Sequence, residues 1–450
     1  MKVTFAEFAK GWLAPGAAGG GEAEGAEPED WGPARRVAFR FAFAYLVLYN
    51  SFGPLTLLGE VPPFSTLMEG YEALWNAIVP WVGRRVLGVT GPIVNAPTGA
   101  GDTMYAYVRL FCDAVLAVAA TAVWSLLDRR RPNYARLQGA LRVYLRYTLA
   151  LAILFYGADK VIKAQFPTPT LGHLARTYGE STPMGLLWTF MGYSTAYNVF
   201  AGAGETLGGL LLFFRRTTTL GALVVSAVMG NVVMLNFCYD VPVKLYSTHL
   251  LLMAFVLLAP DARRLADVLV LGRATAALAP RAPFRARWLE RARLVVKPLF
   301  IVGALWTVTS LALSGYQVRG PDAPKPELYG MYQVESFERK SGGAAAPWAT
   351  LAVGRGSLVM RRADGAGRSL RVKLDPDKKR IELAPLPAGL RAPGEGPVEL
   401  AYERPDPEHL RLEGEFEGEA IVVTLKKVPE PPSRLMSRGF HWVNELPYNR

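Results

Sequence analysis

The sequence predicts an all-α polytopic membrane bundle followed by a small antiparallel β-barrel or sandwich domain. Hydrophobic residues make up 51% of the 450-residue chain, and they come in long runs, as membrane spans do, rather than at amphipathic spacing. The arginines behind the net charge of +12 lie in short loops between those runs. From about residue 321 the runs give way to short segments of alternating polarity, which are typical of strands.

The charge and the cysteine content argue against several classes of function: nucleic-acid binding and metal binding are not expected. Because the basic loops follow the positive-inside rule, the charge is a topology signal and we expect no nucleic-acid partner. Cys112 and Cys238 fall in predicted spans and form neither a C-x-x-C motif nor a spacing suited to metal ligands, so no metal site is expected. Residues 1–34 lack the apolar core of a signal peptide and are expected to form a flexible cytoplasmic leader.

Residues 35–141 are predicted to contain the first two spans and an external interfacial helix. The first span covers about 36–58 and begins beside several arginines, so its N-terminus should face the cytoplasm. Residues 66–86 have mixed polarity and predict a helix that lies on the membrane surface. The second span, 104–127, returns inward and ends at the basic run 128–132.

Residues 142–262 are predicted to form a four-helix membrane core. Its spans cover 143–164, 185–214, 218–237 and 245–258. Residues 263–320 supply a basic cytoplasmic segment and a last span over 294–313. About seven crossings in total place the N-terminus in the cytoplasm and the C-terminal domain in the periplasm or outside the cell. We therefore expect a multi-pass protein of the bacterial inner (plasma) membrane, with the lipid bilayer as its first partner.

Residues 321–450 are predicted to form an external β-rich domain. About seven or eight short segments alternate with period two, and turn signals such as Asp364-Gly365 separate them. That number of short strands favours a small antiparallel barrel or sandwich. The last residues, 438–450, are dense in aromatic and polar groups and suggest a tail that closes the barrel's core or docks on the membrane.

A carboxylate, Glu205, lies in the middle of the fourth predicted span. A charge there costs about 3 kcal/mol, so such residues usually face a bundle interior or a wet cavity and mark function. Asn198, Gly202, Glu205 and Gly209 recur every three or four residues and share one helical face, where the small residues allow a neighbouring helix to approach. Glu205 is either a proton-accepting or ligand-anchoring group, or a structural hydrogen bond or ion pair.

Other polar residues gather towards the predicted outer ends of the spans. Lys160 and Lys163 end the third span, where snorkelling to the interface would explain the lysines alone. Together with Glu205 they could instead line one polar cavity that opens outward. Further candidates for that cavity are Asp113, Asn231, Asn236, Asp240 and His249. Asp113 could equally pair with Arg109 at i−4, and a lone His249 could be a hydrogen-bonded interior residue.

A series of motifs occurs in order between residues 146 and 261. Arg146 starts a span, Gly157 and Lys160 lie at its outer end, FAGAGETLGG follows at 200–209, and an Arg-Arg-Thr turn follows at 215–217. In these features the region resembles the DoxX-like membrane protein family, whose fold is a four-helix membrane bundle. The resemblance implies that Lys160, Glu205 and the glycine pair at 208–209 belong to a shared core. Members of that family are associated with quinone-linked sulfur oxidation, respiratory accessory roles and redox homeostasis.

Two parts of the chain depart from the DoxX-like pattern. The predicted topology adds about three spans, and the β-domain follows them. In that domain the stretch LYGMYQVESF at 328–337 is similar, at this one motif, to the first strand of lipocalin-like barrels. A simple electron-transfer subunit therefore does not account for the whole chain.

The leading hypothesis is a DoxX-like protein that binds a quinone or similar amphiphile in the outward-facing cavity, with a redox or respiratory accessory role. Glu205 would exchange a proton, Lys160 or Lys163 would hold an anionic partner, and Asn231 and Asn236 would hydrogen-bond the ligand. The cofactor is unknown, a quinone being the candidate, and activity as a quinone-linked oxidoreductase component stays open. The alternatives are a small-solute or proton transporter, and a scaffold whose β-domain, 321–450, recruits an external protein.

Overall fold

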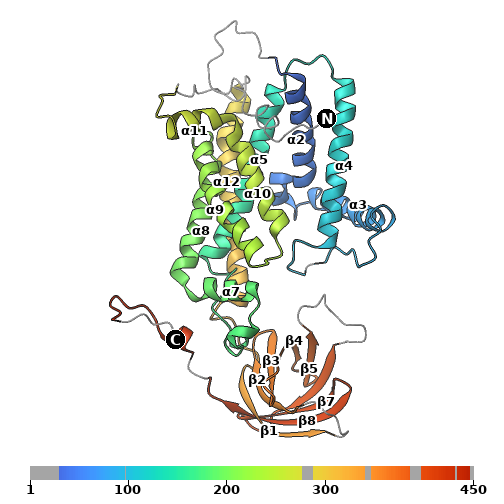
Figure 1. Cartoon of the computed structure of the whole chain (residues 1–450), viewed down its shortest axis with the longest axis vertical. Coiled ribbons are helices and arrows are strands. Elements are labelled where there is room, and N and C mark those ends of the chain that lie inside the picture. Colours follow the sequence, from blue (N-terminus) through green and yellow to red (C-terminus); the bar gives the residue numbers. More distant parts are fainter. Residues whose placement is uncertain are drawn as a thin grey trace. The chain divides into compact units, whose positions relative to one another are not determined.

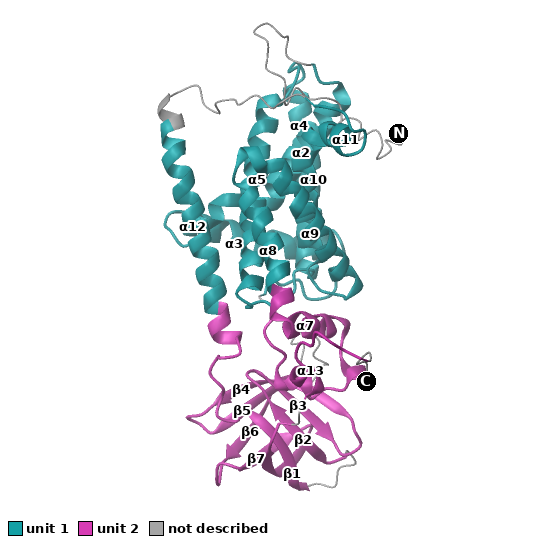
Figure 2. Cartoon of the chain, turned by 90° about the vertical axis from the view of Figure 1, so that its left-hand side faces the viewer, with its two compact units in different colours: residues 1–165, 199–314 teal, residues 166–198, 315–450 magenta. Residues whose placement is uncertain are grey.

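The chain divides into two compact units. The computed structural model describes residues 30–96, 98–275, 287–339, 346–385, 397–430 and 433–445. One unit combines residues 1–165 with 199–314, and the other combines 166–198 with 315–450 (Figure 2). The first unit is helical and the second contains a β-barrel (Figure 1). Of the predicted leader, only residues 30–34 are described.

Within the described residues, six helices are long and apolar enough to cross a membrane, so the chain is a multi-pass membrane protein. An α-helix satisfies its backbone hydrogen bonds internally, which is the condition for crossing hydrocarbon. These six stretches are Pro33–Leu58, Met104–Leu127, Ala135–Val161, Arg215–Cys238, Lys244–Leu269 and Arg291–Arg319. The α-helices that lie wholly or mainly in this unit are α2 (Pro33–Asn50), α3 (Phe64–Arg85), α4 (Met104–Leu127), α5 (Ala135–Val161), α8 (Thr195–Leu212), α9 (Thr218–Cys238), α10 (Lys244–Leu258), α11 (Ala262–Leu269) and α12 (Arg287–Arg319). Short 3-10 turns are η1 (Gly53–Leu58), η3 (Arg215–Thr217) and η4 (Ala259–Asp261).

The predicted fourth span, 185–214, is not one continuous helix. A helix α7 (Pro183–Tyr193) ends at Ser194, whose ψ of 104° is extended, and α8 begins at the next residue. Among the described residues, α8 is not one of the six helices that are long and apolar enough to cross a membrane, and it carries Asn198 and Glu205. A seventh crossing by α8 stays a prediction. The external helix predicted at 66–86 is present as α3, and its interfacial position stays a prediction.

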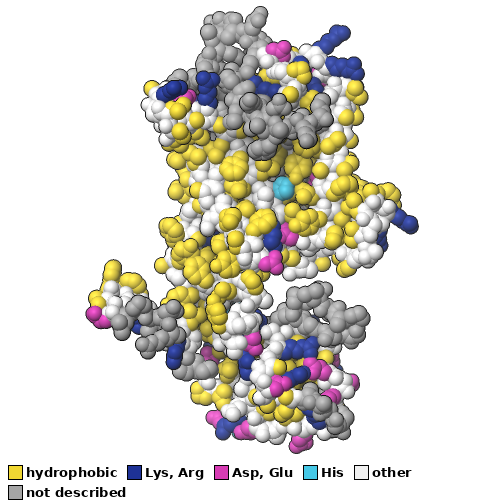
Figure 3. Space-filling model, in the orientation of Figure 1, with side chains coloured by type: hydrophobic (Ala, Val, Ile, Leu, Met, Phe, Trp, Pro, Cys, Tyr) yellow, Lys and Arg dark blue, Asp and Glu magenta, His cyan; other side chains and the backbone are white. Residues whose placement is uncertain are grey.

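Helix α5 occupies the centre of the helical unit. Leu145, Leu149 and Leu154 on this helix are almost completely buried and belong to one cluster with residues of α2, α9, α10 and α12. The outer helices instead expose large apolar side chains, such as Leu127 at 82% and Trp306 at 75%. Hydrophobic side chains cover the middle of this unit, and basic ones gather at its upper end (Figure 3). That distribution matches a bundle surrounded by lipid.

The second unit contains a closed antiparallel barrel of eight strands, which confirms the predicted barrel over a sandwich. Each strand pairs with its neighbours in sequence, and β8 returns to β1 through pairs such as Met331↔Val428. The strands are β1 (Gly330–Arg339), β2 (Trp348–Val353), β3 (Ser357–Arg362), β4 (Gly367–Asp375), β5 (Arg380–Pro385), β6 (Val398–Glu403), β7 (His409–Phe416) and β8 (Glu419–Val428). Leucines of alternate strand positions, including Leu351, Leu412 and Leu425, are 0% exposed. Side chains therefore fill the interior as a core.

The segment 166–198, which the sequence places in the membrane core, clusters with the barrel. It contains α6 (Leu171–Leu174), the 3-10 turn η2 (Tyr178–Glu180) and α7. Arg361 on β3 donates a hydrogen bond to the Ala175 carbonyl oxygen at 3.1 Å and one to Glu180 Oε2 at 3.0 Å. A short helix, α13 (Arg434–Ser437), follows the barrel, and Trp442 beyond it is 91% exposed, so this part of the tail does not close the barrel's core.

Candidate functional site

A buried ion pair joins α5 to α8 inside the helical unit. Lys160 Nζ, one residue before the end of α5, lies 2.7 Å from Glu205 Oε2 and donates to Oε1 at 2.9 Å. The two residues are only 6% and 2% exposed. Burying two charges costs several kcal/mol each unless they are paired and hydrogen-bonded, as these are. The structure thus brings together two of the residues that the sequence singled out.

Glycines let the two helices approach closely enough for this pair to form. A Cβ added to Gly202 would lie 2.8 Å from the Gly157 carbonyl oxygen, and one added to Gly157 would lie 2.8 Å from the Thr206 nitrogen. Gly209 likewise faces α5, since its Cβ would lie 2.7 Å from Leu154 Cγ. Such contacts bring backbone against backbone, as small residues do in membrane helices. The face predicted from the three- and four-residue spacing is therefore the α5-facing side.

Further polar groups surround the ion pair. Lys160 Nζ lies 5.6 Å from the centre of the Tyr156 ring, whose own centre is 6.2 Å from that of Tyr246 on α10. Thr206 Oγ1 is buried and has no hydrogen-bond partner among the described residues. Each oxygen of a carboxylate can accept more than one hydrogen bond, so Glu205 keeps acceptor capacity beyond Lys160. Thr206 and Tyr246 were not singled out by the sequence analysis. Thr206 follows Glu205 directly in the chain, and this position could have marked it as a neighbour of the carboxylate.

His249 forms a separate cluster with two tyrosines of α2. Its Nδ1 lies 2.7 Å from the Leu245 carbonyl oxygen, and because a carbonyl only accepts, Nδ1 carries the proton. Nε2 then accepts from the Tyr45 hydroxyl at 2.6 Å, and the Tyr49 ring stacks on the imidazole at 3.8 Å. Both ring nitrogens of His249 are thus hydrogen-bonded. This agrees with the alternative in which His249 is a hydrogen-bonded interior residue. The i, i+4 spacing of Tyr45 and Tyr49 was the signal for their shared face.

Asp113 pairs with Arg109, one of the two alternatives that the sequence left open. Arg109 Nε donates to both Asp113 oxygens at 3.1 Å within α4. The guanidinium also lies 3.5 Å from the centre of the Trp75 ring on α3 and donates to the Tyr71 hydroxyl at 2.8 Å. This arrangement fastens α3 to α4.

The remaining candidates make local contacts. Asn236 Nδ2 donates to Ser247 Oγ at 3.0 Å, and Asp240 pairs with Lys244 at 2.8 Å. Asn231 is exposed on α9, and Lys163 is buried just beyond α5, with a φ of 63°. In the barrel unit, at the start of α8, Asn198 Nδ2 donates to the Phe166 carbonyl oxygen at 3.2 Å, while its buried Oδ1 has no partner among the described residues.

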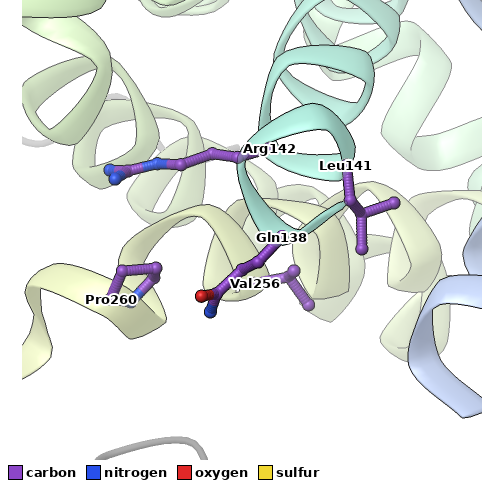
Figure 4. A pocket seen from close by; sticks show the side chains of 5 residues that line it. All are labelled: Gln138, Leu141, Arg142, Val256 and Pro260. Carbon is purple, nitrogen blue, oxygen red and sulfur yellow. The ribbon is translucent and has the colours of Figure 1, made fainter. Parts of the chain in front are cut away.

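Two pockets are lined by neither Lys160 nor Glu205. The first, lined by Gln138, Leu141, Arg142, Val256 and Pro260, measures about 10 Å³, which is room for one water molecule (Figure 4). The second, about 360 Å³, lies on the barrel unit beside the ends of β1 and β8. Among the described residues, no group of three histidine, cysteine or acidic side chains could hold a metal ion.

Part of the chain is similar to a known bacterial protein. No family model matches the chain. The uncharacterized protein YwoB of Bacillus subtilis (strain 168) is 36% identical over 133 residues, which cover 84% of YwoB and 29% of this chain. The chain belongs to the YwoB family.

Membership of the YwoB family accounts for less than a third of the chain and brings no activity with it, because YwoB is itself uncharacterized. Among solved structures, a lipocalin-like protein from Bacteroides uniformis ATCC 8492 is 19% identical over 23% of this chain and all of its own length, with a TM-score of 0.18. A TM-score this low does not establish a shared fold. The barrel is established by its own strand pairing.

Proposed function

We propose that this member of the YwoB family is a DoxX-like protein of the bacterial inner membrane that binds a quinone or similar amphiphile beside Lys160 and Glu205. In this proposal the N-terminus lies in the cytoplasm and the barrel lies outside the membrane. The role is that of an accessory in membrane redox chemistry, as the resemblance to the DoxX-like family implies. In any redox step the quinone itself would gain or lose the electrons, and the protein would bind and orient it.

The buried Lys160–Glu205 pair carries this proposal. Ionisable groups are costly inside a bundle of apolar helices, and such groups usually mark a substrate or proton pathway. A purely structural pair could be replaced by apolar residues at little cost or even with a gain in stability. The buried Thr206 hydroxyl, which has no partner among the described residues, and the Tyr156 ring lie beside the pair, and a ring with oxygen substituents would contact such groups.

Each residue has a distinct part in binding. Glu205 accepts a hydrogen bond from a hydroxyl of the ligand, and Lys160 donates to a carbonyl or anionic oxygen. Tyr156 supplies an aromatic face next to the ammonium group. Asp113, Asn236, Asp240 and His249 have local partners, so the proposal does not need them.

Co-purification tests the proposal. The full-length protein and its Glu205→Gln variant are purified in mild detergent, and mass spectrometry identifies the small molecules that each retains. We expect a quinone or a defined amphiphile in the wild type and its loss from the variant, because glutamine keeps the shape but removes the charge that holds Lys160 in place. Equal retention by both folded proteins would contradict the proposal.

A second variant separates binding from folding. Removing one partner of a buried pair can cost about 3–5 kcal/mol, so Glu205→Gln alone could lower stability. The double variant Lys160→Met, Glu205→Gln leaves no unpaired charge and should melt closer to the wild type. Loss of the ligand from this stable double variant assigns the effect to binding.

The barrel supports a second candidate role as a recruitment module. Its interior is filled by a hydrophobic core, which favours an outer-surface function over ligand storage inside the barrel. Ion pairs such as Arg380–Glu399 cover its outside. In this role the barrel binds an external protein partner while the helical unit binds the amphiphile. Pull-down with the full-length protein, compared with a variant carrying Arg380→Glu, tests for such a partner.

A further inference from the structure

Cations from three distant parts of the chain meet at the basic end of the helical unit. They are Arg146 on α5, Arg215 in η3 and Lys297 on α12. Arg146 lies within electrostatic range of Arg142 and Arg215, and Lys297 lies within range of Arg146 and Arg293. Like charges repel, so the fold brings these side chains together at a cost.

The acid beside this cluster is already engaged. Asp261 Oδ2 lies 2.5 Å from Arg142 Nη2 and accepts a hydrogen bond from Thr219 Oγ1 at 2.7 Å. Arg264 Nη1 lies 3.9 Å from the other oxygen. Asp261 therefore balances Arg142 and Arg264. Among the residues that the structure describes, no carboxylate pairs with Arg146 or Lys297, so their charges are open to another anion.

Arg146 has an unused hydrogen-bond donor. Its Nε is buried and has no partner among the described residues, while Nη1 reaches Thr218 Oγ1 at a long 3.4 Å. A buried donor without a partner is costly, and the planar guanidinium is suited to two parallel hydrogen bonds to a phosphate or carboxylate. The group is thus prepared for an oxyanion.

Apolar and aromatic side chains lie directly beside the cations. Lys297 Nζ lies 4.6 Å from the centre of the Phe214 ring, and the Arg146 guanidinium lies 5.0 Å from that of Tyr147. On α12, Leu294 and Leu299 are 62% and 66% exposed. An anion at this position would therefore adjoin a surface suited to hydrocarbon chains, which a free ion does not use.

We propose that Arg146, Arg215 and Lys297 bind the phosphate group of an anionic phospholipid, whose acyl chains lie along α12. Basic pockets between membrane helices are suited to such head groups, because the anion offsets the repulsion between the cations. The site is separate from the Lys160–Glu205 pair, since Arg146 and Lys160 are 14 positions apart on α5, a rise of about 21 Å. The inference does not depend on the proposed function.

Defined lipids test the site. The full-length protein is purified and stripped of lipid in detergent, then mixed with phosphatidylglycerol, cardiolipin or phosphatidylcholine, and followed by native mass spectrometry and thermal unfolding. We expect the two anionic lipids to be retained and to raise the melting temperature, and phosphatidylcholine to do neither. Arg146→Gln and Lys297→Gln should each weaken the anionic lipids roughly fivefold. Arg136→Gln, on the exposed side of the same helix, is the matched control and should bind like the wild type.

Other outcomes would overturn the assignment. Equal stabilisation by phosphatidylcholine and phosphatidylglycerol, or unchanged lipid binding in Arg146→Gln and Lys297→Gln, would sink the site. Stabilisation by inorganic phosphate alone, to the same extent as by phosphatidylglycerol, would show a free-anion site and not a lipid site. Without lipid, Arg146→Gln should melt no lower than the wild type because it relieves repulsion. If that variant does not fold, the more exposed Lys297→Gln carries the test.

Discussion

Glu180 and Arg361 lie 181 positions apart in the chain, and their ion pair holds the segment 166–198 against the barrel. The hydrogen bond from Arg361, and then that from the Thr177 backbone N–H, lowers the pKa of Glu180 from 4.5 to about 2. A carboxyl group whose pKa is lower in the folded state stabilises that state above its unfolded pKa. The contribution is therefore complete above about pH 4.5 and disappears as the pH falls towards 2.

Hydrogen exchange of residues 177–181 checks this pH dependence. We expect Glu180→Gln to exchange faster than the wild type at pH 6, because the variant lacks the charged pair. The difference should shrink below pH 4.5 and vanish as the pH falls below 2, where the wild type is protonated as well. Glu403→Gln, an exposed acid on β6, serves as the control and should exchange like the wild type. A difference that stayed constant down to pH 2 would rule out ionisation of Glu180 as the cause.

At the scale of elements, the contact between α5 and α8 depends on glycines, which have no side chain to hold the two helices apart. Gly202 lies over the Gly157 carbonyl oxygen and the Lys160 Cβ, with no room for a methyl group. The close approach places Lys160 and Glu205 within hydrogen-bond distance, which longer side chains at these glycines would prevent. Helix packing and the ion pair therefore depend on the same few positions.

Substituting Gly202 tests this dependence. In Gly202→Ala the new Cβ would lie 2.7 Å from the Lys160 Cβ and 2.8 Å from the Gly157 oxygen, so we expect a loss of about 1–3 kcal/mol in the free energy of unfolding. Gly303→Ala on α12 is the matched control, because its Cβ meets nothing within 4 Å and alanine favours the helix. Chaotrope unfolding in detergent measures both, and equal stability of the two variants would contradict close packing at Gly202.

At the scale of the whole molecule, the helical unit holds the ion pair and the cation cluster, and the barrel unit has a core of its own. Buried residues recur every three or four positions in the helical core and every second position in the barrel core. A substitution inside the barrel should therefore act on the barrel's stability and leave binding by the helices unchanged.

Leu425→Ala on β8 examines this independence. Leu425 is 0% exposed, so its truncation should cost the barrel about 2–5 kcal/mol. We expect weaker protection of barrel residues in hydrogen exchange and unchanged retention of amphiphile and anionic lipid. Lys426→Ala, at the exposed neighbouring position, should change neither quantity. Loss of ligand from a Leu425→Ala protein whose helices remain folded would mean that the barrel contributes to binding.

The sequence by itself determined the kinds of element and most of their places. Hydropathy runs located the six membrane-capable helices, and period-two alternation located the strands, because both patterns follow from local backbone geometry. Glu205 and Lys160 stood out because charges in apolar runs are costly. Hydropathy did not predict the break at Ser194, where a helix ends between two apolar stretches.

Only the tertiary structure decided which polar groups meet. It paired Glu205 with Lys160, gave Asp113 to Arg109, left Asn231 exposed and closed the eight strands into a barrel. It also placed 166–198 with the barrel and gathered Arg146, Arg215 and Lys297. These outcomes depend on how each helix is rotated and on contacts between residues far apart in the chain, which no local pattern of side chains encodes.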